Sequence, residues 1–207
     1  MRDLRYAVRR LIREPRFTAT ALGTLALCLG ANLTLFALVD AILLRPLPFP
    51  ESGRLVSLWN TYPKAGVDRD GSSITNYYER RGKIPAFSSL AIYRQGAAIL
   101  GPTGATERVE VTRVSPEFFA TLGVQPAQGR AFAEAETDRS NDAVVLLTDG
   151  FWRERLGADP QVLGRELRVD GASRRVVGVL PADFRFLSSH ARLYLPLSTR
   201  PEDRAPS

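Results

Sequence analysis

Few residues of this chain have the types and spacing that catalysis requires. Among 207 residues there is one histidine, His190, and one cysteine, Cys28. Because the single cysteine lies within an apolar run, one histidine remains for a His-based catalytic triad or a Cys/His zinc site, and most such sites would be incomplete. The sequence contains neither a GxxxxGK[ST] phosphate-binding loop nor a GxSxG nucleophile elbow. We expect no enzyme, no cofactor, and no catalytic, cofactor-binding or metal-ligating residue, with His190 in a surface loop.

One group of carboxylates could suggest a different chemistry, the binding of calcium. Its members are Glu134, Glu136, Asp138 and Asp142. Their spacing is not that of a helix-loop-helix calcium site, and the central glycine of such a site is missing. We expect a solvated acidic loop.

The element on which the rest of the chain depends is the apolar run 17–44. Residues 17–39 carry no charge, and about 20 residues of helix are enough to cross a hydrocarbon core. Within the run, Asn32 prefers a polar partner on a neighbouring helix, and Gly30 leaves space for one. We predict a transmembrane helix that packs against others. The alternatives are a buried core helix of a soluble protein and a cleaved signal peptide.

The charge of the chain is unevenly distributed along it. The formal total is +6. Before Phe17, six Arg stand against two acidic residues, which leaves only +2 for the rest of the chain. This distribution does not indicate a basic nucleic-acid-binding face. Because Arg is retained on the cytoplasmic side of a membrane helix, we expect a cytoplasmic N-terminus in the inner membrane.

These patterns divide the chain into three parts. Residues 1–16 are predicted to be a cytoplasmic, Arg-rich amphipathic helix in contact with the lipid bilayer; the alternative is that its Arg residues serve only to set the topology. Residues 17–44 are the membrane helix, and residues 45–207 form an extracytoplasmic, periplasmic domain. Its first residues, 45–50, carry three alternating prolines and predict a stiff exit from the membrane. No run after Leu44 is long and apolar enough for a second membrane helix.

Within 45–207 the patterns alternate between strands and short helices. Strands are predicted at 54–59, 91–100, 107–114, 143–147, 166–169, 174–180 and 194–197. Helices are predicted at 73–81, after Pro85, from Ser115 to Gly123, and after Thr148, with 62–73 as a loop. Trp59, Trp152, Phe118 and Phe119 are predicted core residues.

Several stretches in the same order resemble a known family. They are 32–50 (NLTLFALVDAILLRPLPFP), 114–124 (VSPEFFATLGV), 128–132 (QGRAF), and the run from Leu146 to 176–181 (VVGVLP). Together they are similar to MacB-like ABC transporter permeases, nearest to the large duplicated permeases of Acidobacteria. The resemblance spans the chain from its first helix to about Leu197.

The resemblance implies an α+β protein: one transmembrane helix, then a mixed α/β periplasmic core domain with a porter-type βαβ part and an inserted small subdomain. It also implies a separate ABC ATPase subunit and a second permease half or homodimer partner. ATP hydrolysis inside would move the periplasmic domain, in export or in mechanotransmission. The later membrane helices of such permeases are not in this sequence, so we expect an N-terminal part with an incomplete domain. The alternative is a stand-alone single-pass protein whose periplasmic domain binds a ligand or a partner protein.

Overall fold

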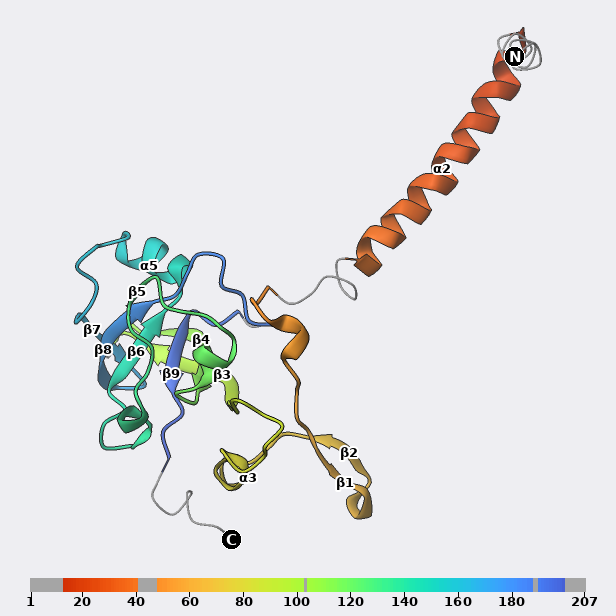
Figure 1. Cartoon of the computed structure of the whole chain (residues 1–207). Helices are drawn as coiled ribbons and strands as arrows, with labels where there is room; N and C mark the ends of the chain where they lie inside the picture. The colour runs from red at the N-terminus through yellow and green to blue at the C-terminus, as the bar shows by residue number, and fades with distance from the viewer. Residues whose placement is uncertain (1–12, 41–47, 103, 188–189, 200–207) are drawn as a thin grey trace. The chain divides into compact units, whose positions relative to one another are not determined.

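The computed structural model describes residues 13–40, 48–102, 104–187 and 190–199 (Figure 1). The chain forms two compact units, Met1–Pro46 and Leu47–Ser207, and we call the second the sheet domain. The predicted helix at 1–16 lies almost entirely outside the described residues, as do 41–44 and the tail after Thr199.

The first unit contains the predicted apolar helix, α2 (Pro15–Val39). Glu14 is not helical, and Pro15 occupies the first turn, where its missing N–H is not needed. The hydroxyls of Thr20, Thr24 and Thr34 each donate to a carbonyl one turn earlier in the same helix. By length and composition α2 can cross a membrane, and among the described residues it is the one helix that can.

The sheet domain is organised around one large sheet with the strand order β5-β8-β6-β9-β4-β3-β7. Its strands are β3 (Tyr93–Leu100), β4 (Glu107–Val114), β5 (Gln128–Gly129), β6 (Val144–Leu147), β7 (Glu166–Val169), β8 (Ala172–Val179) and β9 (Leu193–Pro196). Strand β7 pairs with β3 and also, antiparallel, with β8. These two pairings close the strands from β8 to β7 into a ring.

The ring is mixed in direction. Strands β3 and β4 form a long antiparallel hairpin, and β7 and β8 form the predicted hairpin around Asp170 and Gly171. Strand β6 is parallel to β8, with helix α5 (Asp149–Leu156) between them in the chain. This is a βαβ crossover with β7 inserted after its helix. The mixed helix and sheet class is therefore confirmed.

Alternating side chains divide the apolar core into two clusters, one on each face of the curved sheet. The first has Val109 and Val111 of β4 with Leu193 and Leu195 of β9, and it continues to Trp152 of α5. The second is aromatic and packs on the other face around Phe118, Phe119 and Tyr194. Period-two alternation of strand side chains explains why neighbouring residues belong to different clusters.

The short helices begin where the sequence provides a cap. Ser73 accepts a hydrogen bond from the Asn76 N–H at the start of α3 (Ile74–Arg80), and Thr148 does the same for α5. Helix α4 (Phe118–Thr121) is shorter than predicted. Ser115, at which the helix was predicted to begin, does not cap it, because its hydroxyl accepts the N–H of Ile92.

A second, two-stranded sheet projects from the sheet domain in Figure 1. It is the hairpin β1 (Asn60–Tyr62) and β2 (Val67–Asp70), joined by the 3-10 turn η3 (Pro63–Ala65). The predicted strand at 54–59 and loop at 62–73 were therefore wrong. Residues 52–54 are instead the 3-10 turn η2 (Ser52–Arg54). The helix predicted after Pro85 was also wrong, because residues 86–92 form turns and irregular backbone.

Candidate functional site

The segment that follows α2 in the chain is anchored in the aromatic core of the sheet domain. Of the predicted stiff exit, Pro48, Phe49 and Pro50 are described, and Phe49 is buried. Its ring centroid lies 6.3 Å from that of Phe184 and 6.5 Å from that of Phe186. These are distances at which aromatic rings attract one another. Phe49 therefore fixes residues 48–50 to the aromatic core of the sheet domain.

Pro50 extends this contact to the end of α4. Gly123 ends that helix with φ +68°, a conformation that glycine adopts without strain. A Cβ at Gly123 would lie 3.3 Å from Cγ of Pro50, closer than ordinary van der Waals contact. The glycine thus lets the proline ring rest directly on the backbone.

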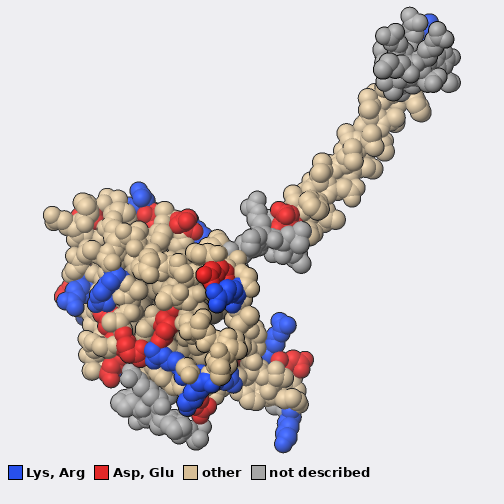
Figure 2. Space-filling model, in the orientation of Figure 1, with Lys and Arg blue, Asp and Glu red and all other residues tan. Residues whose placement is uncertain are grey.

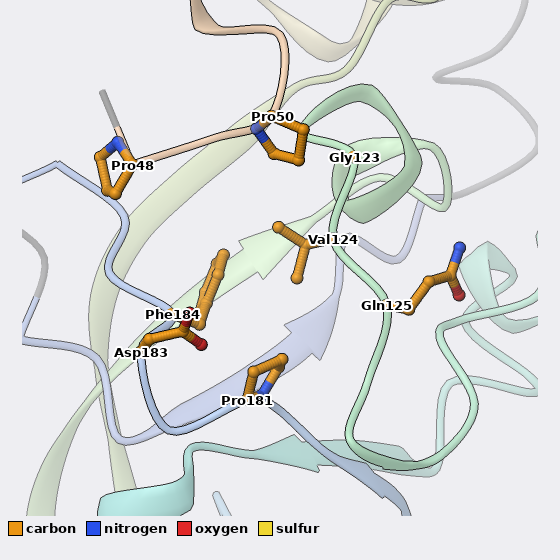
Figure 3. A pocket seen from close by; sticks show the side chains of 8 residues that line it. All are labelled: Pro48, Pro50, Gly123, Val124, Gln125, Pro181, Asp183 and Phe184. Atoms are coloured by element: carbon orange, nitrogen blue, oxygen red, sulfur yellow. The ribbon is translucent and has the colours of Figure 1, made fainter. Parts of the chain in front are cut away.

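A hollow of about 350 Å³ adjoins the anchored segment (Figure 3). Pro48 and Pro50 contribute one part of its wall, and the loop after β8 contributes another. The stretch that follows α4 completes it. The lining residues are Pro48, Pro50, Gly123, Val124, Gln125, Pro181, Asp183 and Phe184.

The lining has little reactive chemistry. Asp183 supplies one carboxylate and Gln125 one amide, and the other residues are apolar or glycine. A general acid-base pair or a nucleophile with its base would need further groups.

A charged network ties α3 to the same part of the domain. Arg81, which follows α3, forms ion pairs with Glu117 at the start of α4 and with Glu134. The buried Tyr77 donates its hydroxyl to Glu117 over 2.7 Å. Burial raises the pKa of Tyr77, and the hydrogen bond to Glu134 raises the pKa of Arg81. Tyr77 therefore keeps its hydroxyl proton and Arg81 keeps its charge, and their contacts fix the short α3 on the domain.

The predicted solvated acidic loop was wrong at Glu136. Its carboxylate is buried and receives two hydrogen bonds from Arg130, at 2.6 and 2.9 Å, and one from the N–H of Ala133. Burial alone would raise the pKa of Glu136, but these hydrogen bonds and the charge of Arg130 outweigh it and lower the pKa. Glu136 is thus a structural ion-pair partner.

The residues singled out in the membrane helix remain candidates for contact. The Asn32 amide donates to the carbonyl of Cys28 over 2.9 Å, within α2 itself. A Cβ at Gly30 would meet no atom within 4 Å. The proposed contacts of these two residues with a neighbouring helix stay predictions.

The predictions for His190 and for the core aromatic residues were correct except at Trp59. His190 is exposed, as expected, beside a second hollow of about 530 Å³ on β3 and β4. Trp152, Phe118 and Phe119 are buried core residues, also as expected. Trp59 is 55% exposed, so its prediction as a core residue was wrong.

Only one side of the contact between Phe49 and its aromatic partners could be predicted from the sequence. The three prolines marked the exit segment, and Phe49 between two of them was a signal for an anchor. The receiving residues Phe184 and Phe186 lie far along the chain, in a stretch without periodic pattern. Their contact with Phe49 comes from the tertiary fold.

The chain thus combines an apolar helix long enough to cross a membrane with a mixed helix and sheet domain. Residues 18–206 match the family of MacB-like periplasmic core domains, and the chain belongs to this family. Comparison with curated proteins gives no match.

Three solved structures are similar to part of this chain. The periplasmic region of MacB from Actinobacillus actinomycetemcomitans is 19% identical over 68% of this chain and 62% of that one, with a TM-score of 0.47. The extracellular domain of the noncanonic ABC-type transporter YknZ from Gram-positive bacteria is 12% identical over 62% and 63%, with a TM-score of 0.46. A domain of a putative permease protein from Porphyromonas gingivalis is 22% identical over 64% and 60%, with a TM-score of 0.45. The chain thus spans about three fifths of the length of these solved domains.

Proposed function

We propose that this chain is the N-terminal part of an ABC transporter permease, in which ATP hydrolysis in the cytoplasm moves the sheet domain outside. The observation that carries the proposal is the packing of Phe49 against Phe184 and Phe186, in the segment that follows α2 in the chain. Membership of the family supports it. In this function the exit segment is a mechanical link, and the chain itself performs no chemistry.

The proposal also covers the partners of the protein and its orientation in the membrane. An ABC ATPase binds on the cytoplasmic side, and a second permease half or a second copy completes the assembly. The N-terminus lies in the cytoplasm, because six Arg precede the apolar helix. The sheet domain then lies in the periplasm. Charged side chains of both signs are interspersed on the face shown in Figure 2, as on an ordinary solvated surface.

The test compares two buried aromatic residues of the same core cluster, Phe49 and Phe132. Replacing either by Ala removes a buried ring and costs about 3–5 kcal/mol of stability. Phe49 is the buried aromatic residue of the exit segment, whereas Phe132 lies elsewhere in the chain, so only Phe49→Ala should uncouple hydrolysis from motion. Phe132→Ala is the control for the cavity alone.

The complete protein is purified from membranes of its source organism in mild detergent. We expect an ABC ATPase to copurify with wild type and with both variants. The trypsin cleavage pattern of the sheet domain should change on addition of ATP and vanadate in wild type and Phe132→Ala, but not in Phe49→Ala. Repeated purification without an ATPase contradicts the proposal and favours the stand-alone binding protein. An unaltered nucleotide response of Phe49→Ala contradicts the role of the anchor.

A further inference from the structure

The dipeptide Asp-Gly occurs three times in the sheet domain, at residues 70–71, 149–150 and 170–171. In this dipeptide the backbone nitrogen of the glycine can attack the side-chain carboxyl carbon of the aspartate before it, because glycine has no Cβ to obstruct the approach. The rate of such an attack within one molecule depends on the proximity and orientation of the two groups. The fold therefore decides which of the three dipeptides reacts.

At Asp70 the two reacting groups are in contact. Asp70 is the last residue of β2, and the Gly71 N–H donates to its Oδ1 over 2.8 Å. The nitrogen thus lies against the carboxyl group that it would attack. A Cβ at Gly71 would meet no atom within 4 Å, so there is room around this peptide for the ring to close.

The backbone on both sides of this contact is held in place. The buried side chain of Asn60 donates to the carbonyl of Gly71 over 3.3 Å, and it accepts a hydrogen bond from Arg80 over 2.9 Å. Asn60 is also the partner of Asp70 in the pairing of β1 with β2. The nitrogen and the carboxyl group therefore need no rearrangement of the hairpin in order to meet.

The carboxylates of the other two dipeptides are engaged elsewhere. Asp170 accepts the Ile99 N–H at Oδ1 over 2.8 Å and a hydrogen bond from Arg113 at Oδ2 over 3.1 Å, so its carboxylate is turned towards β3 and β4. Asp149 pairs with Arg153 over 2.8 Å within the first turn of α5. In either case an attack by the following nitrogen would first have to break an ion pair.

We propose that Asp70 is a site of spontaneous modification, at which aspartate converts to isoaspartate without an enzyme. The Gly71 nitrogen forms a bond to Cγ of Asp70, and its proton leaves with the carboxyl OH as one molecule of water. The product is a cyclic imide. Water then reopens the imide at one of its two carbonyls, which gives either aspartate or isoaspartate. The conversion is an isomerisation, so it needs no oxidant and no other reactant.

Isoaspartate at this position changes the base of the hairpin. The main chain then runs through the side-chain carbon atoms of residue 70, which lengthens it by one methylene group. This extra length falls between the ladder position that pairs with Asn60 and the cap of α3 at Ser73. We therefore expect the modified chain to lose the hydrogen bond between Asn60 and the carbonyl of Gly71.

The test follows all three dipeptides in one sample of the full chain. The protein is kept for several weeks in mild detergent, in water enriched in oxygen-18, and is then digested with trypsin in ordinary water. An arginine lies between each pair of sites, so they fall on separate peptides. Every passage through the imide introduces one oxygen-18 atom, which mass spectrometry counts, and chromatography separates the isoaspartyl peptide. We expect labelling at Asp70 to be at least about tenfold faster than at Asp149 and Asp170.

Two substitutions test the cause of this difference. Gly71→Val places a branched side chain on the attacking residue and should slow labelling at Asp70 to the level of Asp149. Arg113→Met frees one oxygen of Asp170 and should speed labelling there severalfold. Arg108→Met, at an exposed arginine of the same strand, is the control and should leave labelling at Asp170 unchanged.

A parallel sample in urea removes the effect of the fold, so the three dipeptides should there react at similar rates. Equal labelling of the three sites in the folded chain overturns the proposal, as does labelling at Asp70 that is slower in the folded chain than in urea. Unchanged labelling at Asp70 in Gly71→Val overturns it as well. The experiment needs no ATPase, nucleotide or partner, so its outcome is independent of the proposed transport function.

Discussion

At the scale of single residues, Glu136 was predicted to be solvated, but its carboxylate is buried and stabilises the fold by pairing with Arg130. Alternating acidic residues at 134–142 carry no sign in the sequence of which one is buried. The deciding partner, Arg130, precedes Glu136 by six positions and reaches it only because the chain turns through η4 (Glu134–Thr137). A charge of this kind is stable inside only when it is paired and hydrogen bonded.

Glu136→Gln should make stability less dependent on pH. The pKa of Glu136 is lowered from its ordinary 4.5, so the carboxylate stabilises the fold above about pH 4.5, and that contribution is lost as pH falls through the lowered value. At pH 7 we expect the variant to lose about 1–3 kcal/mol. Below the folded pKa, wild type and variant should converge. The measurement is urea unfolding of the full chain in detergent at several pH values.

The control for this prediction is Glu154→Gln. Glu154 pairs with Arg192 at 2.5 Å but is exposed, so its replacement should change stability by less than about 1 kcal/mol. A pH profile of Glu136→Gln that runs parallel to wild type would show that the buried pair does not carry this dependence.

At the scale of elements, agreement between sequence and structure follows the range of the interactions. Strand β4 was visible because Val109 and Val111 alternate with polar residues, and the turn at Asp170 and Gly171 is a local signal. The hairpin β1–β2 was missed because Val67–Asp70 has one apolar residue in four and no alternation. Its strands form around the buried Asn60, a long-range contact that no periodicity reveals.

The closure of the sheet could not be predicted from the sequence either. It depends on β7 reaching β3, where the Gly101 N–H donates to the carbonyl of Arg168 and the Asp170 N–H to that of Ile99. These pairs are separated by about seventy positions in the chain, and both strands had been predicted only as members of local hairpins. The candidate site was half predictable for the same reason, since Pro48 and Pro50 are local signals and Phe186 is not.

Strand β5 is the element most sensitive to a single methyl group. Gly129 has φ +74°, and a Cβ there would lie 2.1 Å from the carbonyl oxygen of Val177. We expect Gly129→Ala to cost about 2–4 kcal/mol, because it adds a clash with strand β8 to an unfavourable backbone conformation. Thermal unfolding of the full chain in detergent measures the loss.

Gly171→Ala is the matched comparison. Gly171 has φ +80°, but a Cβ there would meet no atom within 4 Å. Its replacement should cost only the backbone term, about 1–2 kcal/mol. Equal losses for the two variants would mean that β5 moves away from β8 without penalty.

At the scale of the whole molecule, the distribution of charge predicts which side of the membrane each unit occupies. In a Cys28→Ser background, we expect Ser88→Cys to react with a membrane-impermeant maleimide in intact spheroplasts. Ala7→Cys, within the Arg-rich N-terminus, should react only after lysis. The reverse pattern of labelling would refute the proposed orientation.

The closed ring of strands has a consequence for how the sheet domain responds to force. An open sheet that is pulled at its edge unzips one hydrogen bond at a time. Here β7 pairs with β3 on one side and β8 on the other, so the ring has no outermost strand to peel away. The domain should therefore act as a stiff lever, which turns or tilts as one body before any strand separates.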